Sequence, residues 1–117
     1  MTGFTPAVKR LVIERDEWTC QWCGTHASAP DVHHRRARGM GGNRAEWINQ
    51  PANLVTLHPR CHAYIEAHPT EAAELGFRLS PGQTPATTPY EDHAGNRWLL
   101  DDHGNKNTHH LNEQETA

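Results

Sequence analysis

Two pairs of possible metal ligands constrain this chain more than any other feature. Cys20 and Cys23 are separated by two residues, and His58 and Cys61 repeat this spacing further along the chain. A gap of two residues lets both ligands of a pair reach one ion without strain, and such paired cysteines and histidines are typical of structural zinc. The sequence therefore predicts one structural Zn²⁺ ion bound by all four residues.

A bound ion would also explain how so short a chain becomes stable. Only 35% of the 117 residues are hydrophobic, so the core is modest. Structural zinc contributes roughly 10–16 kcal/mol in small peptide sites at neutral pH, which exceeds what such a core supplies. Three cysteines cannot all form disulfides with one another. A redox-active Cys-x2-Cys pair is disfavoured because no βαβ pattern surrounds it, and buried cysteines without a metal are the other alternative.

The residues around these ligands predict a small α+β fold. Thr5 and Pro6 are typical of a helix start, and apolar residues at helical spacing follow them. Pro59 is typical of the first turn of another helix. The expected elements, in chain order, are a helix from 6 to about 16, strands at 31–36 and 53–57 with a glycine-rich loop at 39–42 between them, and helices at 59–67 and 70–76.

The character of the sequence changes after Ser80. Prolines interleaved with Thr, Gly and Gln predict an extended linker. The apolar residues at 97–100 indicate a possible short strand, and the polar end of the chain is expected to be a flexible acidic tail. The chain is therefore divided into a domain at 1–80, with its motif core at 18–68, and an extended segment at 81–117.

Charge is distributed unevenly along the chain. The net charge of −3 argues, taken alone, against binding to nucleic acid. Residues 1–62, however, hold eight Lys or Arg against five Asp or Glu, whereas residues 63–117 hold three against nine. Because the local field matters more than the net charge, the basic half is suited to binding a polyanion.

Nothing in the sequence indicates a membrane protein or a secreted one. No apolar stretch approaches the length of about 18 residues that a membrane-spanning helix needs. The N-terminal region lacks the charged start and apolar block of a signal peptide. Ten histidines and three cysteines without a secretion signal predict a cytoplasmic metalloprotein.

A second set of polar residues remains once the zinc ligands are assigned. It consists of His33, His34, Asn53 and His62. The two expected strands and the helix from residue 59 would form a β-β-α unit with these residues around it. His62 follows the zinc ligand Cys61, and one residue turns a helix by about 100°, so His62 can serve a different ion.

The run from Cys20 to His62, with the residues just before it, resembles the HNH endonuclease family, the ββα-metal nucleases. It is similar to small members encoded by bacteriophages and their hosts, in the variant with a Cys/His structural zinc. Each matching piece is short, but they occur together in the family's order. The pieces are RDEWTCQWCG at 15–24, VHHRR at 32–36, Gly41-Gly42, and NLVTLHPRCH at 53–62.

The resemblance implies a role for each residue of the second set. His34 would be the general base that activates water, and Asn53 would orient its ring. His33 and His62 would bind one catalytic divalent ion, Mg, Mn, Ni or Zn, which stabilises charge on the scissile phosphate. Three arginines are expected to contact neighbouring DNA phosphates, namely Arg35, Arg36 and Arg38.

Two positions depart from the usual family pattern. His58 stands where family members commonly carry a cysteine, and histidine still ligates zinc. His33 stands where many members carry aspartate. Two imidazoles favour Zn, Ni, Co or Mn relative to Mg, although Mg is abundant in cells.

The resemblance implies a metal-dependent endonuclease that hydrolyses DNA with low sequence specificity of its own, because phosphate contacts dominate in so small a domain. The alternative is a zinc-stapled nucleic-acid-binding or accessory protein of a phage packaging or restriction assembly that does not cut. A third interpretation is a purely structural zinc domain that presents its acidic tail to a protein. The intact histidine and asparagine set favours the enzyme, because binding alone needs no general base.

Overall fold

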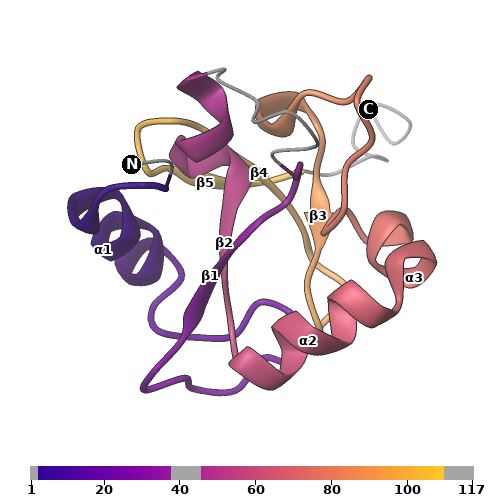
Figure 1. Ribbon diagram of the computed structural model, residues 1–117, viewed down its shortest axis with the longest axis horizontal. Coiled ribbons are helices and arrows are strands. Elements are labelled where there is room, and N and C mark those ends of the chain that lie inside the picture. The colour runs from indigo at the N-terminus through magenta and orange to yellow at the C-terminus, as the bar shows by residue number, and fades with distance from the viewer. Residues whose placement is uncertain (1–2, 38–45, 110–117) are drawn as a thin grey trace, which may run out of the picture.

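A two-stranded antiparallel hairpin lies at the centre of the fold (Figure 1). The computed structural model describes residues 3–37 and 46–109. Strand β1 (Asp31–His34) pairs with β2 (Leu54–Leu57), and the register places His33 opposite Val55 and His34 opposite Leu54. Helix α2 (Pro59–Ala67) follows β2 directly, so the predicted strand, strand, helix order is confirmed.

Helix α1 (Pro6–Arg15) covers one face of this hairpin. The Thr5 side chain accepts a hydrogen bond from the Val8 amide at 3.1 Å and caps the helix, and proline occupies its first position. Val12 and Ile13 are buried against β1 and β2 in a cluster with Val32 and Leu54. The predicted N-terminal helix is therefore confirmed, and its apolar face is what holds it to the sheet.

Strand β2 is buried on both faces, because successive side chains of a strand point to opposite sides. Leu54 faces α1, whereas Val55 and Leu57 belong to the main core on the other side of the hairpin. That core also contains Ile65 of α2 and Phe77. A strand of four residues can therefore be apolar almost throughout and still belong to a small domain.

Helices α2 and α3 (Pro69–Glu74) form a pair at one end of the molecule (Figure 1). Each begins at a proline, whose missing N–H costs nothing in the first turn. Both helices were predicted from sequence within one or two residues. Within the described ranges, no helix is both long enough and apolar enough to cross a lipid bilayer.

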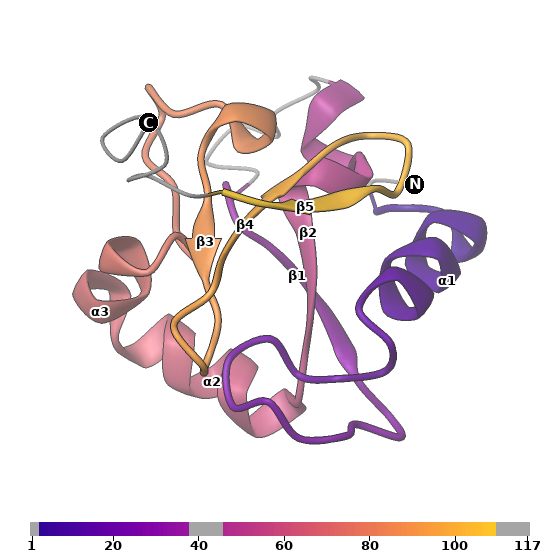
Figure 2. The same cartoon turned by 180° about the vertical axis from the view of Figure 1, so that it is seen from behind.

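The segment after Ser80 is not the extended linker that the sequence predicts. It forms the short turn η3 (Pro85–Thr87) and a three-stranded antiparallel sheet of β3 (Tyr90–Glu91), β4 (Arg97–Leu100) and β5 (Lys106–Thr108). Figure 2 shows this sheet in front of the hairpin when the molecule is seen from behind. Tyr90 and Leu100 are buried in the main core. The possible strand at 97–100 is β4, and the expected tail at 110–117 lies outside the described residues.

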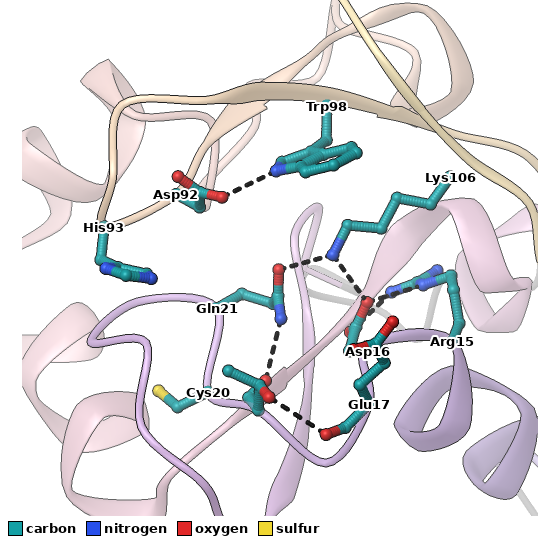
Figure 3. A pocket seen from close by; sticks show the side chains of 10 residues that line it. Arg15, Asp16, Glu17, Cys20, Gln21, Asp92, His93, Trp98 and Lys106 are labelled. Carbon is teal, nitrogen blue, oxygen red and sulfur yellow. Dashed lines mark hydrogen bonds and ion pairs between the residues drawn. The ribbon is translucent and has the colours of Figure 1, made fainter.

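A buried polar network ties this C-terminal sheet to the turn after α1 (Figure 3). Asp16 is 2% exposed, and its carboxylate accepts from Arg15 at 2.9 Å and from Lys106 Nζ at 3.3 Å. The same Lys106 nitrogen donates to Gln21 Oε1 at 2.7 Å, and the Tyr90 hydroxyl donates to that oxygen as well. These groups satisfy one another, so the network is structural and fixes β5 and β3 against the N-terminal half.

Candidate metal centres

Three cysteine thiols lie close together at the N-terminal end of α2. The Sγ atoms of Cys20, Cys23 and Cys61 all lie within 4.8 Å of one another, close enough to bind one metal ion. Cys20 and Cys61 are buried, and the Cys23 amide donates to Cys20 Sγ at 3.5 Å. Gly24 closes the turn with φ of +80°, a conformation that favours glycine. The turn therefore brings Cys20 and Cys23 to the thiol of a residue far along the chain.

The surroundings of two of the thiols shift their pKa values in opposite directions. Burial raises the pKa of Cys61 to about 12, together with hydrogen bonding and charge from the other two cysteines. Burial also opposes ionisation of Cys23, but hydrogen bonds from Thr25, Cys20 and Cys61 outweigh it and lower the pKa of Cys23 to about 7. Cys61 would ionise beside Cys23 more readily if a positive ion offset their repulsion.

His58, the predicted fourth ligand, is next to this group but not in it. The group that the structure brings together contains the three cysteines. His58 Nε2 is 2.8 Å from the Thr25 hydroxyl oxygen, which is itself 3.2 Å from Cys23 Sγ. The threonine hydroxyl thus stands between the imidazole and the nearest thiol. Of the predicted set of three cysteines and one histidine, the structure therefore brings together the three sulfur atoms, and the Thr25 side chain separates His58 from them.

A second group of possible ligands includes His62 and Glu66, which lie on a different face of α2 from Cys61. The ligand atoms of His33, His62 and Glu66 fall within 4.8 Å of one another. The rings of His33 and His62 meet edge to face with centroids 5.0 Å apart, and His62 Nε2 is 3.4 Å from a Glu66 oxygen. Two imidazoles and a carboxylate suit a divalent transition-metal ion. Thus the pair predicted from sequence is brought together, with Glu66 added to it.

The His33 ring is oriented by the backbone. Its Nε2 lies 2.7 Å from the Phe77 carbonyl oxygen, which can only accept, so Nε2 carries the proton and Nδ1 carries the lone pair. Burial lowers the pKa of His33 to about 4. The hydrogen bond to the Phe77 carbonyl raises this pKa, whereas charges on His62, His34 and Arg35 lower it further. His33 is therefore neutral at physiological pH, as a metal ligand must be.

The His62 ring is oriented by a carboxylate. Its Nδ1 lies 3.0 Å from Asp31 Oδ2, which directs Nε2 toward Glu66. A carboxylate behind an imidazole is a common arrangement at metal sites, because it fixes the tautomer and raises the basicity of the ligand. Asp31 is therefore a positioning residue for this group, supplied by the first residue of β1.

His34 and His33 leave opposite faces of β1, because they are consecutive residues of a strand. The His34 ring lies 5.6 Å from that of Phe4, and its Nε2 is 2.8 Å from Asn49 Oδ1. With the amide oxygen as acceptor, Nε2 carries the proton, and the basic nitrogen of this tautomer is Nδ1. Asn49 belongs to the short helix η1 (Glu46–Asn49).

Asn53 does not orient His34, contrary to the role that the family resemblance implies. It is fully buried at the end of the turn η2 (Pro51–Asn53). Its side chain accepts from the Arg36 amide at 2.8 Å and donates to the carbonyls of Arg36 and Ile48 at 3.0 and 2.9 Å. All of these partners are backbone groups. Asn53 therefore holds the two ends of the connection between β1 and β2, and the ring contact belongs to Asn49.

Arg35 does not contact solvent, so the prediction that it binds a DNA phosphate is wrong. Its side chain is buried, and it donates to four carbonyl oxygens from separate parts of the chain. These are Gly76 at 2.9 Å, Ala52 at 3.0 Å, Pro85 at 3.1 Å and Thr88 at 2.5 Å. Burial lowers the pKa of Arg35 to about 10, although Tyr90 opposes this shift. Arg35 thus connects the hairpin, the end of α3 and the C-terminal segment by hydrogen bonds inside the protein.

The His33, His62 and Glu66 group opens into a cavity of about 300 Å³. Its lining also includes His34 and the exposed Arg78. Among the described residues, no acceptor is hydrogen-bonded to the Arg78 guanidinium, so this cation can bind an anion in the cavity. Of the other predicted phosphate contacts, Arg36 lies over the Trp47 ring at 4.4 Å, and Arg38 lies outside the described residues.

Four site residues were missed from sequence, and one of them had a signal. Glu66 stands four residues after His62 on a helix, a spacing that places both on one face. Asp31, Asn49 and Arg78 have no comparable pattern, because each reaches the site through the pairing of segments that are distant in sequence.

Comparison with known proteins does not assign this chain. No protein-family model, no curated protein and no solved structure matches it. What the structure establishes is a small α+β fold with a three-cysteine group that could hold a metal ion and a second group of two histidines and a glutamate.

Proposed function

We propose that this protein is a metal-dependent endonuclease of the HNH type that hydrolyses DNA phosphodiester bonds. The observation that carries the proposal is the group of His33, His62 and Glu66, whose ligand atoms lie within 4.8 Å at a cavity lined also by His34 and Arg78. His33, His62 and Glu66 would supply metal ligands, and Arg78 would supply a cation that has no hydrogen-bonded acceptor among the described residues. His34 leaves the opposite face of β1 but lines the same cavity, and it would supply the base that phosphodiester hydrolysis needs.

The ligand set fits a divalent ion without rearrangement of its supports. The Phe77 carbonyl and the Asp31 carboxylate already direct one ring nitrogen of each histidine away from the group. A divalent ion held by His33, His62 and Glu66 would stabilise negative charge on the scissile phosphate and on the departing 3′ oxygen. The mixed nitrogen and oxygen donors suit Mn, Ni, Zn or Mg.

His34 is the residue we assign as general base. Its basic nitrogen would take a proton from the attacking water, while Asn49 holds the opposite side of the ring. Oxygen then bonds to phosphorus, the bond from phosphorus to the 3′ oxygen breaks, and that oxygen takes a proton from solvent. The products are a 5′-phosphate and a 3′-hydroxyl. Arg78 would contact a neighbouring phosphate.

The three-cysteine group has a structural role in this proposal. It would hold Zn²⁺ with His58 as the fourth ligand, the imidazole replacing Thr25 as the neighbour of Cys23. Because Cys61 and His62 are adjacent on α2, that ion would fix the helix that carries two of the catalytic-site ligands.

The test is cleavage of supercoiled plasmid by the zinc-loaded protein with Mg²⁺, Mn²⁺, Ni²⁺ or Zn²⁺ added. We expect nicking by the wild type and a loss of roughly 10²–10⁴-fold in His34→Ala, the usual contribution of a general base. The matched control is His103→Ala, which removes an exposed histidine from the turn between β4 and β5.

Cleavage that persists unchanged in His34→Ala would remove that residue from the mechanism. Plasmid that is bound but not cut under all four ions would instead favour the alternative, a zinc-stapled nucleic-acid-binding module. Salt dependence of the binding then reports how many phosphates are contacted, and Arg78→Ala is expected to lower its slope by about one.

A further inference from the structure

A second cavity, of about 240 Å³, lies at the end of the hairpin away from α2. Its lining comes from the segment after β1, from η1 and η2, from η3 and the residue before it, and from the turn between β4 and β5. Figures 1 and 2 show η1 and η3 near each other at this end of the molecule. The lining residues are Arg36, Trp47, Ala52, Thr84, Pro85, Ala86 and Asp102.

One wall of this cavity is a preformed stack. The Arg36 guanidinium lies over the Trp47 ring, 4.4 Å from its centroid. Asn53 holds both backbone polar groups of Arg36, so the stack rises from a fixed point of the chain. Pro85 and Ala86 of η3 also line the cavity. A cavity lined by an arginine-stacked indole and small apolar groups favours a flat aromatic guest.

The polar groups of the cavity have unused hydrogen-bonding capacity. Within residues 3–37 and 46–109, no acceptor is hydrogen-bonded to the Arg36 guanidinium. One oxygen of Asp102 accepts from the Ala52 amide at 3.0 Å, and the other has no partner in the same ranges. The cavity thus offers donors on one side and an acceptor on another, which matches the edge of a nucleobase with both a carbonyl and an amino group.

We propose that this cavity receives one unpaired nucleobase of the nucleic-acid substrate, next to the phosphate that is cut. The volume suits a single base, since pockets for larger ligands usually measure about 300–1,000 Å³. The position is coupled to the active site, because Arg36 is two residues from His34 and Trp47 is two residues from Asn49, which contacts His34. This inference rests on the proposed function and names the form of substrate that it takes.

The test compares two single-stranded DNA oligonucleotides of equal length and charge, one of cytidines and one entirely abasic. Binding is measured with zinc-loaded protein and no added divalent ion, so that the strands remain intact. Phosphate contacts are common to both strands. Stacking of a base on an aromatic side chain is worth enough that we expect the wild type to bind the base-bearing strand about tenfold more tightly.

Two variants locate that preference. Trp47→Ala removes the stacking surface, and Ala86→Phe fills the cavity from an exposed position, so the second variant tests the cavity even if the first does not fold. Both are expected to bind the two strands equally. Trp18→Ala, the control, removes an exposed tryptophan outside the cavity and is expected to keep the preference.

Each result of these binding measurements either supports or overturns the base pocket. Equal binding of both strands by the wild type, or a preference that survives in Ala86→Phe, overturns the base pocket and leaves the proposed endonuclease intact. Failure to bind either strand or duplex plasmid overturns both proposals. A preference that is lost in Ala86→Phe and kept in Trp18→Ala supports the pocket whether or not cleavage is detected.

Discussion

Two groups of possible metal ligands share helix α2 and differ in almost every other respect. The thiol group, formed by Cys20, Cys23 and Cys61, belongs to the main core, where Cys20 and Cys61 are buried. The histidine group ends in the exposed Glu66 and opens into a cavity. Structural zinc sites are closed by protein ligands, whereas catalytic sites keep a position open for water or substrate.

The residues that hold the side chains in place also differ between the two groups. The thiols are held by a tight turn and by one another, so their geometry would depend on an ion bound between them. The imidazoles of His33 and His62 are held by Phe77 and Asp31, which are not ligands. Preorganised ligands keep their geometry when an ion leaves, which a site with exchanging water and substrate requires. The predictions below separate the two groups on these grounds.

The largest expected difference is in folding stability, between substitutions of the adjacent residues Cys61 and His62 of α2. Chelation of the thiol-bound ion, or Cys61→Ser, is expected to unfold the protein, because structural zinc contributes roughly 10–16 kcal/mol and total stabilities are about 5–15 kcal/mol. His62→Ala is expected to leave the fold in place. Circular dichroism melts and zinc content by native mass spectrometry check both variants. A zinc-free Cys61→Ser protein that melts like the wild type would break the comparison.

The next effect is the pH dependence that burial of His33 creates. Its pKa is lowered to about 4 from 6.5, so the unfolded chain binds more protons between these values, and stability falls as pH decreases from 6.5 toward 4. The full shift corresponds to about 3 kcal/mol. His33→Gln keeps a donor for the Phe77 carbonyl but does not titrate.

Urea unfolding of both proteins from pH 7 to pH 4 measures this effect. Acid also releases an ion from thiolates, but that loss is common to the two proteins and cancels in their difference. The wild type is expected to lose about 3 kcal/mol relative to His33→Gln over this range. A difference that stays constant with pH would show that His33 is not buried as a neutral ring.

Local pattern and spacing predicted most of the N-terminal fold, the three cysteines of one group and the two histidines of the other, but they missed Glu66 and placed His58 in a group that it does not join. Capping by Thr5, prolines at helix starts and paired ligands are signals within a few residues, and the corresponding elements are confirmed. The predictions that were wrong concern what distant segments do to one side chain. Arg35 looks like a surface cation in sequence, but its acceptors are backbone carbonyls, which carry no side-chain signature.

Apart from the possible strand at 97–100, which is β4, the C-terminal sheet was missed for a related reason. Its strands have two to four residues, too few for an alternating pattern to be distinguished from a proline-rich linker. The sheet is held to the rest of the protein by the burial of Tyr90 and Leu100 and by the contact of Lys106 with Asp16. These are isolated residues whose partners lie on the other side of the domain. Sequence therefore predicted which cysteines and histidines come together better than it predicted the residues that hold them in place.

The smallest effect tests those supports directly. Asp31→Asn keeps a side chain of the same size but removes the charge behind His62, so we expect the ion of the histidine group to bind roughly 10–100-fold more weakly, with the thiol-bound zinc retained. Calorimetric titration of zinc-loaded protein with Mn²⁺ measures this, and Glu14→Gln, which removes an exposed carboxylate on α1, is the control. If Asp31→Asn binds Mn²⁺ as the wild type does while His62→Ala does not, the contact between Asp31 and His62 adds nothing to the affinity. The histidine group would then depend on its ion for its geometry just as the thiol group does.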